Sequence, residues 1–174
     1  SMATSGPGAT NMLTGIVGAW YDCIPAVYIT GQVRTWELTG KDKLLQRGFQ
    51  EVDIVNMVKS ITKYSTTINE INDLRYELEK AYYLATSGRP GPVLLDIPMN
   101  IQWGMINPNE LKSFAPDKKI MKVDSNILKN IKEKINDSKK PLIVGGGGIV
   151  HSNSNIEFIN FVEKHNLPCV FSYP

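Results

Sequence analysis

The sequence has little that points to a membrane or to a strongly charged partner. No run approaches the roughly 20 apolar residues that a membrane-spanning helix needs. The 19 Lys and Arg residues nearly balance the 17 Asp and Glu residues, for a formal net charge of +2, which argues against nucleic acid or an anionic membrane as a partner. No signal-peptide pattern precedes the first motif, so we expect a cytoplasmic globular protein.

Cysteine and histidine are also scarce. Cys23 and Cys169 lie far apart in apolar surroundings, which predicts buried free thiols, with a disulfide between them as the alternative. His151 and His165 have no ligand-type partner at metal-binding spacing, so we predict no metal site. A G-x-S-x-G elbow, a catalytic Cys/His arrangement and a P-loop are all absent, and the sequence assigns no catalytic residue.

The first half of the chain alternates apolar strands with helical patterns. The clearest helix is Asn69–Thr86, whose apolar residues recur at spacings of three and four before Gly88 and Pro90 end it. The other expected elements are a helix over Asn11–Asp22, a strand over Ala26–Thr30, a surface loop over Thr35–Gly48, a short helix over Asp53–Val58, an extended segment over Ile61–Thr67 and an apolar strand over Val93–Ile97.

A second series of elements follows a segment from Met99 to about Val123 that reads as a linker. Its first helix is expected after Asp124 or Ser125 as cap, and its charged Lys129–Lys140 stretch reads as a solvated helix face rather than a binding patch. The remaining elements are a strand over Leu142–Val144, a helix over Ile156–Lys164 and a strand from Cys169.

This alternation predicts an α/β protein of parallel sheets with helices on both faces. We expect two incomplete α/β units, residues 1–103 and 122–174, joined by a linker over 104–121.

The glycine run Gly145–Gly148 is the strongest generic ligand signal. It follows a predicted strand, and such turns leave backbone N–H groups free to meet phosphate. The run does not match G-x-G-x-x-G, and Asn153 and Ser154 place the next helix start several residues late. A phosphate-binding turn and a plain tight turn therefore both remain open.

Phe49 and Gln50 offer an apolar wall and an orienting amide, a pair suited to a substrate pocket. The alternative places Phe49 in the core and Gln50 in solvent. Glu51 and Asp53 resemble a catalytic carboxylate pair, but that pairing dissolves if Asp53 caps the helix that follows it.

Four segments together carry a family resemblance: Ser5–Asn11 with its Gly-Pro-Gly turn, Gly31–Val33, Phe49–Val55 and Thr86–Pro98. In this order they resemble the acetolactate synthase group of thiamine diphosphate-dependent enzymes. The resemblance implies that residues 1 to about 103 correspond to the later part of the pyrimidine-binding domain. Residues from about 122 would begin the central domain, which holds FAD in a structural role in acetolactate synthases.

The resemblance also implies roles for particular residues. Pro7 and Asn11 would lie beside the aminopyrimidine ring of thiamine diphosphate, and Phe49 and Gln50 would line the substrate side of a site that faces a neighbouring subunit. Gly145, Gly146, Gly147 and Gly148 would lie near FAD. The implied chemistry is decarboxylation of pyruvate and transfer of the two-carbon unit to a second 2-oxo acid, in a homo-oligomer.

Some features depart from the family pattern. The activating glutamate and the G-D-G…N motif that holds Mg²⁺ and the diphosphate have no counterpart here, so we expect the isolated chain to be inactive. The loop between Val33 and Phe49 looks long, and Arg34 stands where the family usually has proline. A relative that acts on another 2-oxo acid therefore stays open. Two further alternatives are a non-oxidative 2-oxo acid decarboxylase of the same fold and a non-catalytic nucleotide-binding or assembly module that lost the active site.

Overall fold

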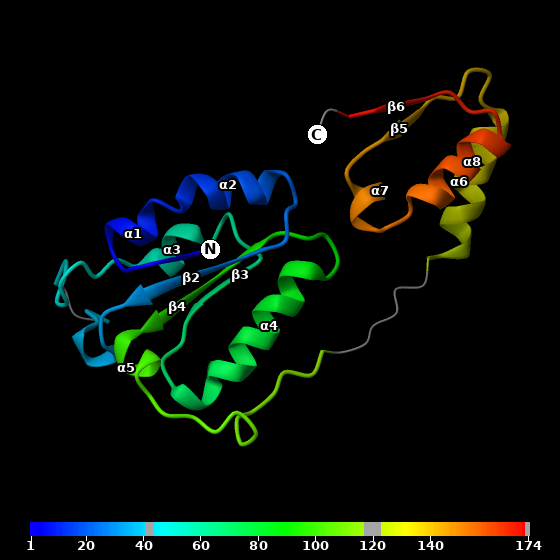
Figure 1. Ribbon diagram of the computed structural model, residues 1–174. Helices are drawn as coiled ribbons and strands as arrows, with labels where there is room; N and C mark the ends of the chain where they lie inside the picture. The colour runs from blue at the N-terminus through cyan, green and yellow to red at the C-terminus, as the bar shows by residue number, and fades with distance from the viewer. Residues whose placement is uncertain (41–43, 117–122, 173–174) are drawn as a thin grey trace. The chain divides into compact units, whose positions relative to one another are not determined.

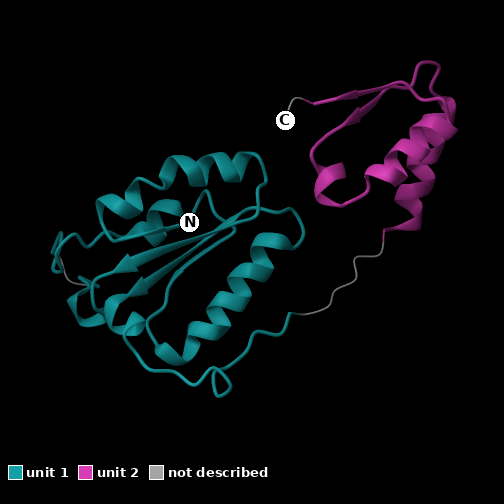
Figure 2. Cartoon of the chain, viewed as in Figure 1, with its two compact units in different colours: residues 1–116 teal, residues 117–174 magenta. Residues whose placement is uncertain are grey.

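The computed structural model describes residues 1–40, 44–116 and 123–172. The chain divides into two compact units, Ser1–Pro116 and Asp117–Pro174 (Figure 2). The predicted assignment of these parts to two named domains stays a prediction.

Unit 1 is built on a parallel sheet of four strands in the order β1-β2-β4-β3. The strands are β1 (Met2–Ala3), β2 (Ala26–Gln32), β3 (Tyr64–Thr67) and β4 (Pro92–Pro98). The structure thus contains the two predicted apolar strands and a strand within the predicted extended segment. The short strand β1 was not predicted.

Helices cover both faces of this sheet, as the α/β pattern predicts (Figure 1). The elements are α1 (Pro7–Thr10), α2 (Leu13–Tyr21) and α3 (Ile54–Val58) on one face, α4 (Leu74–Thr86) on the other, α5 (Met99–Gln102) after β4, and the 3₁₀ turns η1 (Thr35–Glu37) and η2 (Ile71–Asp73). Within β4, Leu94 packs with Ile16 and Ile54, whereas Val93 and Leu95 pack with α4. Burial of the strand on both faces explains its apolar sequence.

Three local expectations differ from the structure. The helix predicted over Asn11–Asp22 is α2, which begins only at Leu13, because Asn11 is the C-cap residue of the preceding helix α1. The segment expected as a linker from Met99 begins with the helix α5, and its residues 117–122 lie outside the described part of the chain. The surface loop expected over Thr35–Gly48 opens with η1, and its residues 41–43 also lie outside the described part.

Unit 2 contains a parallel pair of strands, β5 (Ile143–Gly145) and β6 (Cys169–Phe171). Its helices are α6 (Ser125–Asp137), α7 (Gly148–His151) and α8 (Asn155–Lys164). The predicted cap of α6 is confirmed, since the Asp124 carboxylate accepts a hydrogen bond of 2.8 Å from the backbone N–H of Asn126. The helix α7 was not predicted: its first residue, Gly148, is the last glycine of the run Gly145–Gly148.

Candidate functional site

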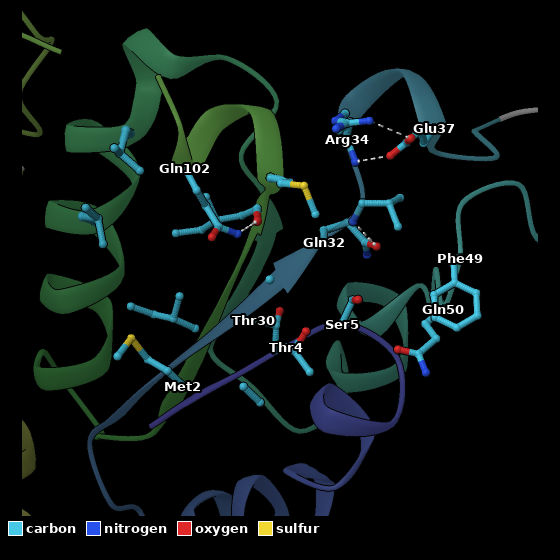
Figure 3. A pocket seen from close by; sticks show the side chains of 18 residues that line it. Met2, Thr4, Ser5, Thr30, Gln32, Arg34, Glu37, Phe49, Gln50 and Gln102 are labelled. Atoms are coloured by element: carbon cyan, nitrogen blue, oxygen red, sulfur yellow. Dashed lines mark hydrogen bonds and ion pairs between the residues drawn. The ribbon is translucent and has the colours of Figure 1, made fainter. Parts of the chain in front are cut away.

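A cleft of about 990 Å³ opens at the carboxyl edge of the unit 1 sheet, where β1, β2 and β4 end (Figure 3). Ligands of open parallel sheets bind at this edge, outside the carboxyl ends of the strands. The lining residues are Met2, Ala3, Thr4, Ser5, Ile29, Thr30, Gly31, Gln32, Val33, Arg34, Glu37, Phe49, Gln50, Leu74, Leu78, Ile97, Met99 and Gln102.

The Gly-Pro-Gly turn meets the Phe49-Gln50 segment beside this cleft. Gly6 has φ +58°, and a Cβ added there would lie 2.8 Å from both Cβ and the carbonyl oxygen of Gln50. Gln50 itself has φ +57°, a conformation that costs energy for a residue with a side chain. The glycine therefore allows two backbone segments to touch that the sequence places far apart.

The predicted site residues of unit 1 are only partly brought together. Phe49 is 86% exposed and lines the cleft with the exposed Gln50, so the alternative that placed Phe49 in the core is wrong. Pro7 is the first residue of α1 and Asn11 its C-cap residue; both are exposed, and neither lines the cleft in the described part of the chain.

Glu51 fastens the loop that leads to Phe49. Its carboxylate accepts hydrogen bonds from the backbone N–H and the hydroxyl of Thr39, each 2.6 Å, and from the backbone N–H groups of Arg47 at 3.0 Å and Gly48 at 3.3 Å. Burial raises the pKa of Glu51, but these hydrogen bonds to the carboxylate outweigh burial and lower the pKa below its ordinary value. Glu51 thus stabilises the loop by hydrogen bonds to Thr39, Arg47 and Gly48.

Asp53 is a helix cap, as the sequence analysis considered. One carboxylate oxygen accepts from the backbone N–H of Asn56 at 3.1 Å, and the other accepts from the Asn56 side-chain amide at 2.6 Å. Since Glu51 and Asp53 are each engaged in these local bonds, they do not form a catalytic carboxylate pair.

A buried polar cluster lies beneath the cleft. Asp96 is 1% exposed, and its carboxylate accepts from the hydroxyl of Thr30 at 2.6 Å, the amide of Gln32 at 2.9 Å and the hydroxyl of Thr67 at 3.4 Å. Burial raises the pKa of Asp96 to about 6, and the three hydrogen bonds oppose that rise. This cluster was not predicted from the sequence, although its signal was present as a charged residue, Asp96, in an otherwise apolar strand.

Gln32 connects the cluster to the loop. The same amide nitrogen donates to the carbonyl of Val52 at 2.9 Å, and the side-chain oxygen accepts from the backbone N–H of Val33 at 3.0 Å. Gln32 is 5% exposed, so its amide is fixed by these contacts. The cluster thereby holds the segment that follows Glu51 against the end of β2.

The glycine run predicted to meet a cofactor lies in unit 2. A Cβ at Gly145 would lie 2.8 Å from the Phe171 ring, so this glycine lets β5 pack closely against the Phe171 side chain of β6. By contrast, the nearest atom to a Cβ at Gly146 would be 3.5 Å away, at Gly147 3.7 Å away, and at Gly148 none lies within 4 Å. The last three glycines are therefore not demanded by the packing of the described residues, which leaves their backbone open.

The remaining predictions concern metals, thiols and membranes. Among the described residues, no group of three or more His, Cys, Asp or Glu side chains is placed to hold a metal ion. Cys23 and Cys169 are free and half-buried rather than fully buried, and the Cys23 thiol accepts a hydrogen bond of 2.9 Å from Arg89 Nε. Within the same residues, every helix is too short or too polar to cross a membrane.

Comparison with known sequences identifies similar proteins. Residues 1–57 match the family described as "Thiamine pyrophosphate enzyme, N-terminal TPP binding domain". The chain is 41% identical to the chloroplastic acetolactate synthase of Arabidopsis thaliana over 96% of this chain and 24% of that protein. It is 40% identical to the acetolactate synthase large subunit of Lactococcus lactis over 97% of this chain and 29% of that protein.

A third relative is the acetolactate synthase large subunit of Buchnera aphidicola, 38% identical over 98% of this chain and 30% of that protein. The chain thus spans less than a third of the length of each of these three curated relatives. The residues matched by the family model include the Gly-Pro-Gly turn and the Phe49-Gln50 segment. The chain belongs to the acetolactate synthase-like family of thiamine diphosphate-dependent enzymes.

Proposed function

We propose that the whole protein to which this chain belongs is a carboligase. It decarboxylates pyruvate and transfers the two-carbon unit to a second 2-oxo acid. The relatives named acetolactate synthase support this proposal, and the observation that carries it is the contact between Gly6 and Gln50 at the carboxyl edge of the sheet. That contact joins the turn expected beside the cofactor to the segment expected beside the substrate.

In this proposal Pro7 and Asn11 hold the aminopyrimidine ring, while Phe49 and Gln50 face the substrate. Their exposure fits such roles, because a flat ring and a small acid both need accessible side chains. The side-chain amide N–H of Gln50 donates a hydrogen bond to a substrate oxygen, and the Phe49 ring keeps water from the reacting centre. Thiamine diphosphate, when bound, supplies the thiazolium carbon that acts as the electron sink of the decarboxylation.

FAD and Mg²⁺ belong to the same proposal. The open backbone of Gly146, Gly147 and Gly148 leaves room for FAD to approach unit 2, whereas Gly145 serves the sheet. The described residues hold no cluster for Mg²⁺, and we assign that ion to the G-D-G…N motif of the family, which this sequence does not contain. Two free half-buried thiols, Cys23 and Cys169, suit a reducing compartment such as the cytoplasm.

A second copy of the chain is the expected partner at this site. Phe49 is 86% exposed and Leu45 of the same loop is 104% exposed, which suits a surface that a neighbouring subunit covers. We therefore propose a homo-oligomer with active sites between subunits and small 2-oxo acids as substrates.

Product analysis of the whole protein with pyruvate, thiamine diphosphate and Mg²⁺ tests the proposal. A carboligase yields a branched hydroxy-oxo acid, a decarboxylase yields an aldehyde, and a nucleotide-binding or assembly module yields neither. The Gln50→Ala variant should lower kcat/KM about 10- to 100-fold by removing an oriented hydrogen bond. Gln46→Ala is the matched control, since Gln46 is an exposed glutamine of the same loop that does not line the cleft.

A further inference from the structure

Arg34 lies at the rim of the cleft (Figure 3). Its guanidinium is close to two exposed indole rings, those of Trp36 and Trp103. Its Cζ is 5.8 Å from the ring centroid of Trp36 and 5.6 Å from that of Trp103. Trp36 follows β2 and is 64% exposed, and Trp103 follows β4 and is 67% exposed. A guanidinium this close to an aromatic face is attracted to it. The two rings therefore restrict the motion of the Arg34 side chain and leave it accessible to solvent.

Glu37 fixes the guanidinium from one side. The Glu37 carboxylate accepts from the backbone N–H of Arg34 at 3.0 Å and from Arg34 Nη1 at 3.3 Å. A guanidinium carries five N–H donors, so one bond leaves most of its hydrogen-bonding capacity unused. In the part of the chain that the structure describes, Glu37 is the one side chain that accepts a hydrogen bond from this guanidinium. The remaining donors are available to a ligand in the cleft.

The cleft otherwise has little charge. Arg34 is the one cation and Glu37 the one anion among the described residues that line it. Apolar side chains from β1, β2, β4, α4 and α5 supply much of the remaining wall, among them Ile29, Ile97 and Met99. A ligand that matches this lining carries one carboxylate and a short apolar chain. A planar guanidinium held in place binds a carboxylate through two parallel N–H···O bonds, which a lysine ammonium does not reproduce.

We propose that Arg34 binds the carboxylate of a small 2-oxo acid substrate and thereby determines which acids enter the cleft. The inference rests on the proposed function for the identity of the acid, and on the geometry of the cleft for the carboxylate. Trp36 and Trp103 position the guanidinium, and Glu37 competes with the substrate for it. This competition predicts that removing the charge of Glu37 tightens binding.

The test is a saturation-transfer NMR titration of the whole protein on the methyl protons of pyruvate, with no thiamine diphosphate or Mg²⁺ added. Arg34→Met should weaken binding of pyruvate about 10- to 100-fold, because it removes a charged hydrogen bond. The affinity of Arg34→Lys for pyruvate should fall between those of the wild type and Arg34→Met. The Glu37→Gln variant should bind pyruvate more tightly than the wild type. Methyl pyruvate, which lacks the charge, should bind weakly to every variant.

Arg75→Met is the matched control. The Arg75 side chain is 40% exposed and pairs with Glu79, much as the 38% exposed Arg34 pairs with Glu37, but Arg75 does not line the cleft. It should leave pyruvate binding unchanged. Equal affinity of the wild type and the Arg34→Met variant, confirmed as folded by circular dichroism, would overturn the inference, as would equal binding of pyruvate and its methyl ester.

The inference and the proposed function can fail separately. Arg34-dependent binding of pyruvate without any product would refute the carboligase and retain the carboxylate site. If Arg34→Met forms a branched hydroxy-oxo acid with an unchanged KM for pyruvate, the carboligase is supported and the carboxylate site at Arg34 is refuted.

Discussion

The two units of this chain contain similar glycine-rich turns in different surroundings. Gly6-Pro7-Gly8 lies between β1 and the four-residue helix α1, which begins at Pro7. Gly145–Gly148 runs from the last residue of β5 to the first residue of the four-residue helix α7. In unit 1, a Cβ at Gly6 would lie 2.8 Å from Gln50, and one at Gly8 would lie 2.8 Å from Thr4. The comparison shows that one sequence pattern can serve either internal packing or an open backbone.

The packing beneath the turns differs as well. Unit 1 buries fully a set of apolar side chains on both faces of its sheet, among them Ile16 and Leu95. Among the described residues of unit 2, Val162 is the only buried hydrophobic, and Ile127 and Phe171 are 54% and 65% exposed. A clash in unit 1 is therefore hard to relieve, whereas side chains of unit 2 have room to move.

The largest effect expected is that of Gly6→Ala. The new Cβ meets Gln50 at 2.8 Å, and the backbone has φ +58° and ψ −123°, so overpacking and strain add. We expect the free energy of unfolding of unit 1 to fall by roughly 3–5 kcal/mol. All three tryptophans of the chain lie in unit 1, so urea unfolding of the 174-residue chain followed by tryptophan fluorescence measures this loss.

Gly88→Ala separates the two causes. Gly88 has φ +59° but nothing within 4 Å of an added Cβ, so it reports the backbone strain alone, about 1–2 kcal/mol. If Gly6→Ala cost no more than Gly88→Ala, the contact between the turn and Gln50 would not be rigid, and the contrast between the two glycine turns would disappear.

The second effect is a pH dependence of the stability of unit 1 that comes from the buried Asp96 carboxylate. The pKa of Asp96 is raised from 3.8 to about 6 in the folded chain, so the folded state holds a proton that the unfolded state has lost between these pH values. Stability from this group is complete below pH 4 and declines as the pH rises to about 6, a loss of about 2–3 kcal/mol. The Asp96→Asn variant should lack this decline.

Urea midpoints of wild type and Asp96→Asn, measured from pH 4 to pH 7, give the test. Other carboxylates contribute in the opposite direction: the hydrogen-bonded Glu51 has a lowered pKa and loses stability as the pH falls. The difference between the two proteins isolates Asp96. A difference that stays constant over this range would show that the Asp96 carboxylate titrates alike in both states.

The third effect lies in unit 2. Gly145→Ala would place a Cβ 2.8 Å from Phe171, whose ring is exposed and can turn aside, so we expect a loss of about 1–2 kcal/mol. Far-UV circular dichroism should report this loss while the tryptophan transition of unit 1 stays unchanged. A shift of the tryptophan transition would mean that the two units unfold together.

Local sequence signals predicted much of this fold. The features that were not predicted depend on contacts between segments that are distant in the sequence. The strand over Ala26–Thr30 and the Asp53 cap were predictable because strand composition and capping act over a few residues. Periodicity likewise predicted a helix over Asn69–Thr86, of which the structure contains α4 from Leu74 onward, after the 3₁₀ turn η2. The short β1 carries no such signal, since its two residues form a strand only by pairing with β2. The approach of Arg34 to Trp103 likewise depends on β2 and β4 ending side by side.

The candidate site shows the same division. Phe49 and Gln50 were predictable as residue types suited to a pocket, and their cleft required the tertiary structure. Asp96 was overlooked because apolar neighbours in β4 dominate the strand pattern, while its partners Thr30 and Thr67 come from two other strands.

The smallest effect is that of Gly148→Ala, and it completes the comparison of the turns. Gly148 is the first residue of α7, has no atom within 4 Å of an added Cβ, and is not among the residues with positive φ. Alanine restricts the unfolded chain more than glycine does, so unit 2 should gain about 0.5 kcal/mol. Far-UV circular dichroism in urea measures the gain in stability. FAD titration of the whole protein measures any loss of affinity for a ligand that approaches the backbone. Stability that rises while FAD affinity falls would show that unit 2 keeps this glycine for a ligand, whereas a loss of stability would show that, like Gly6, it serves packing.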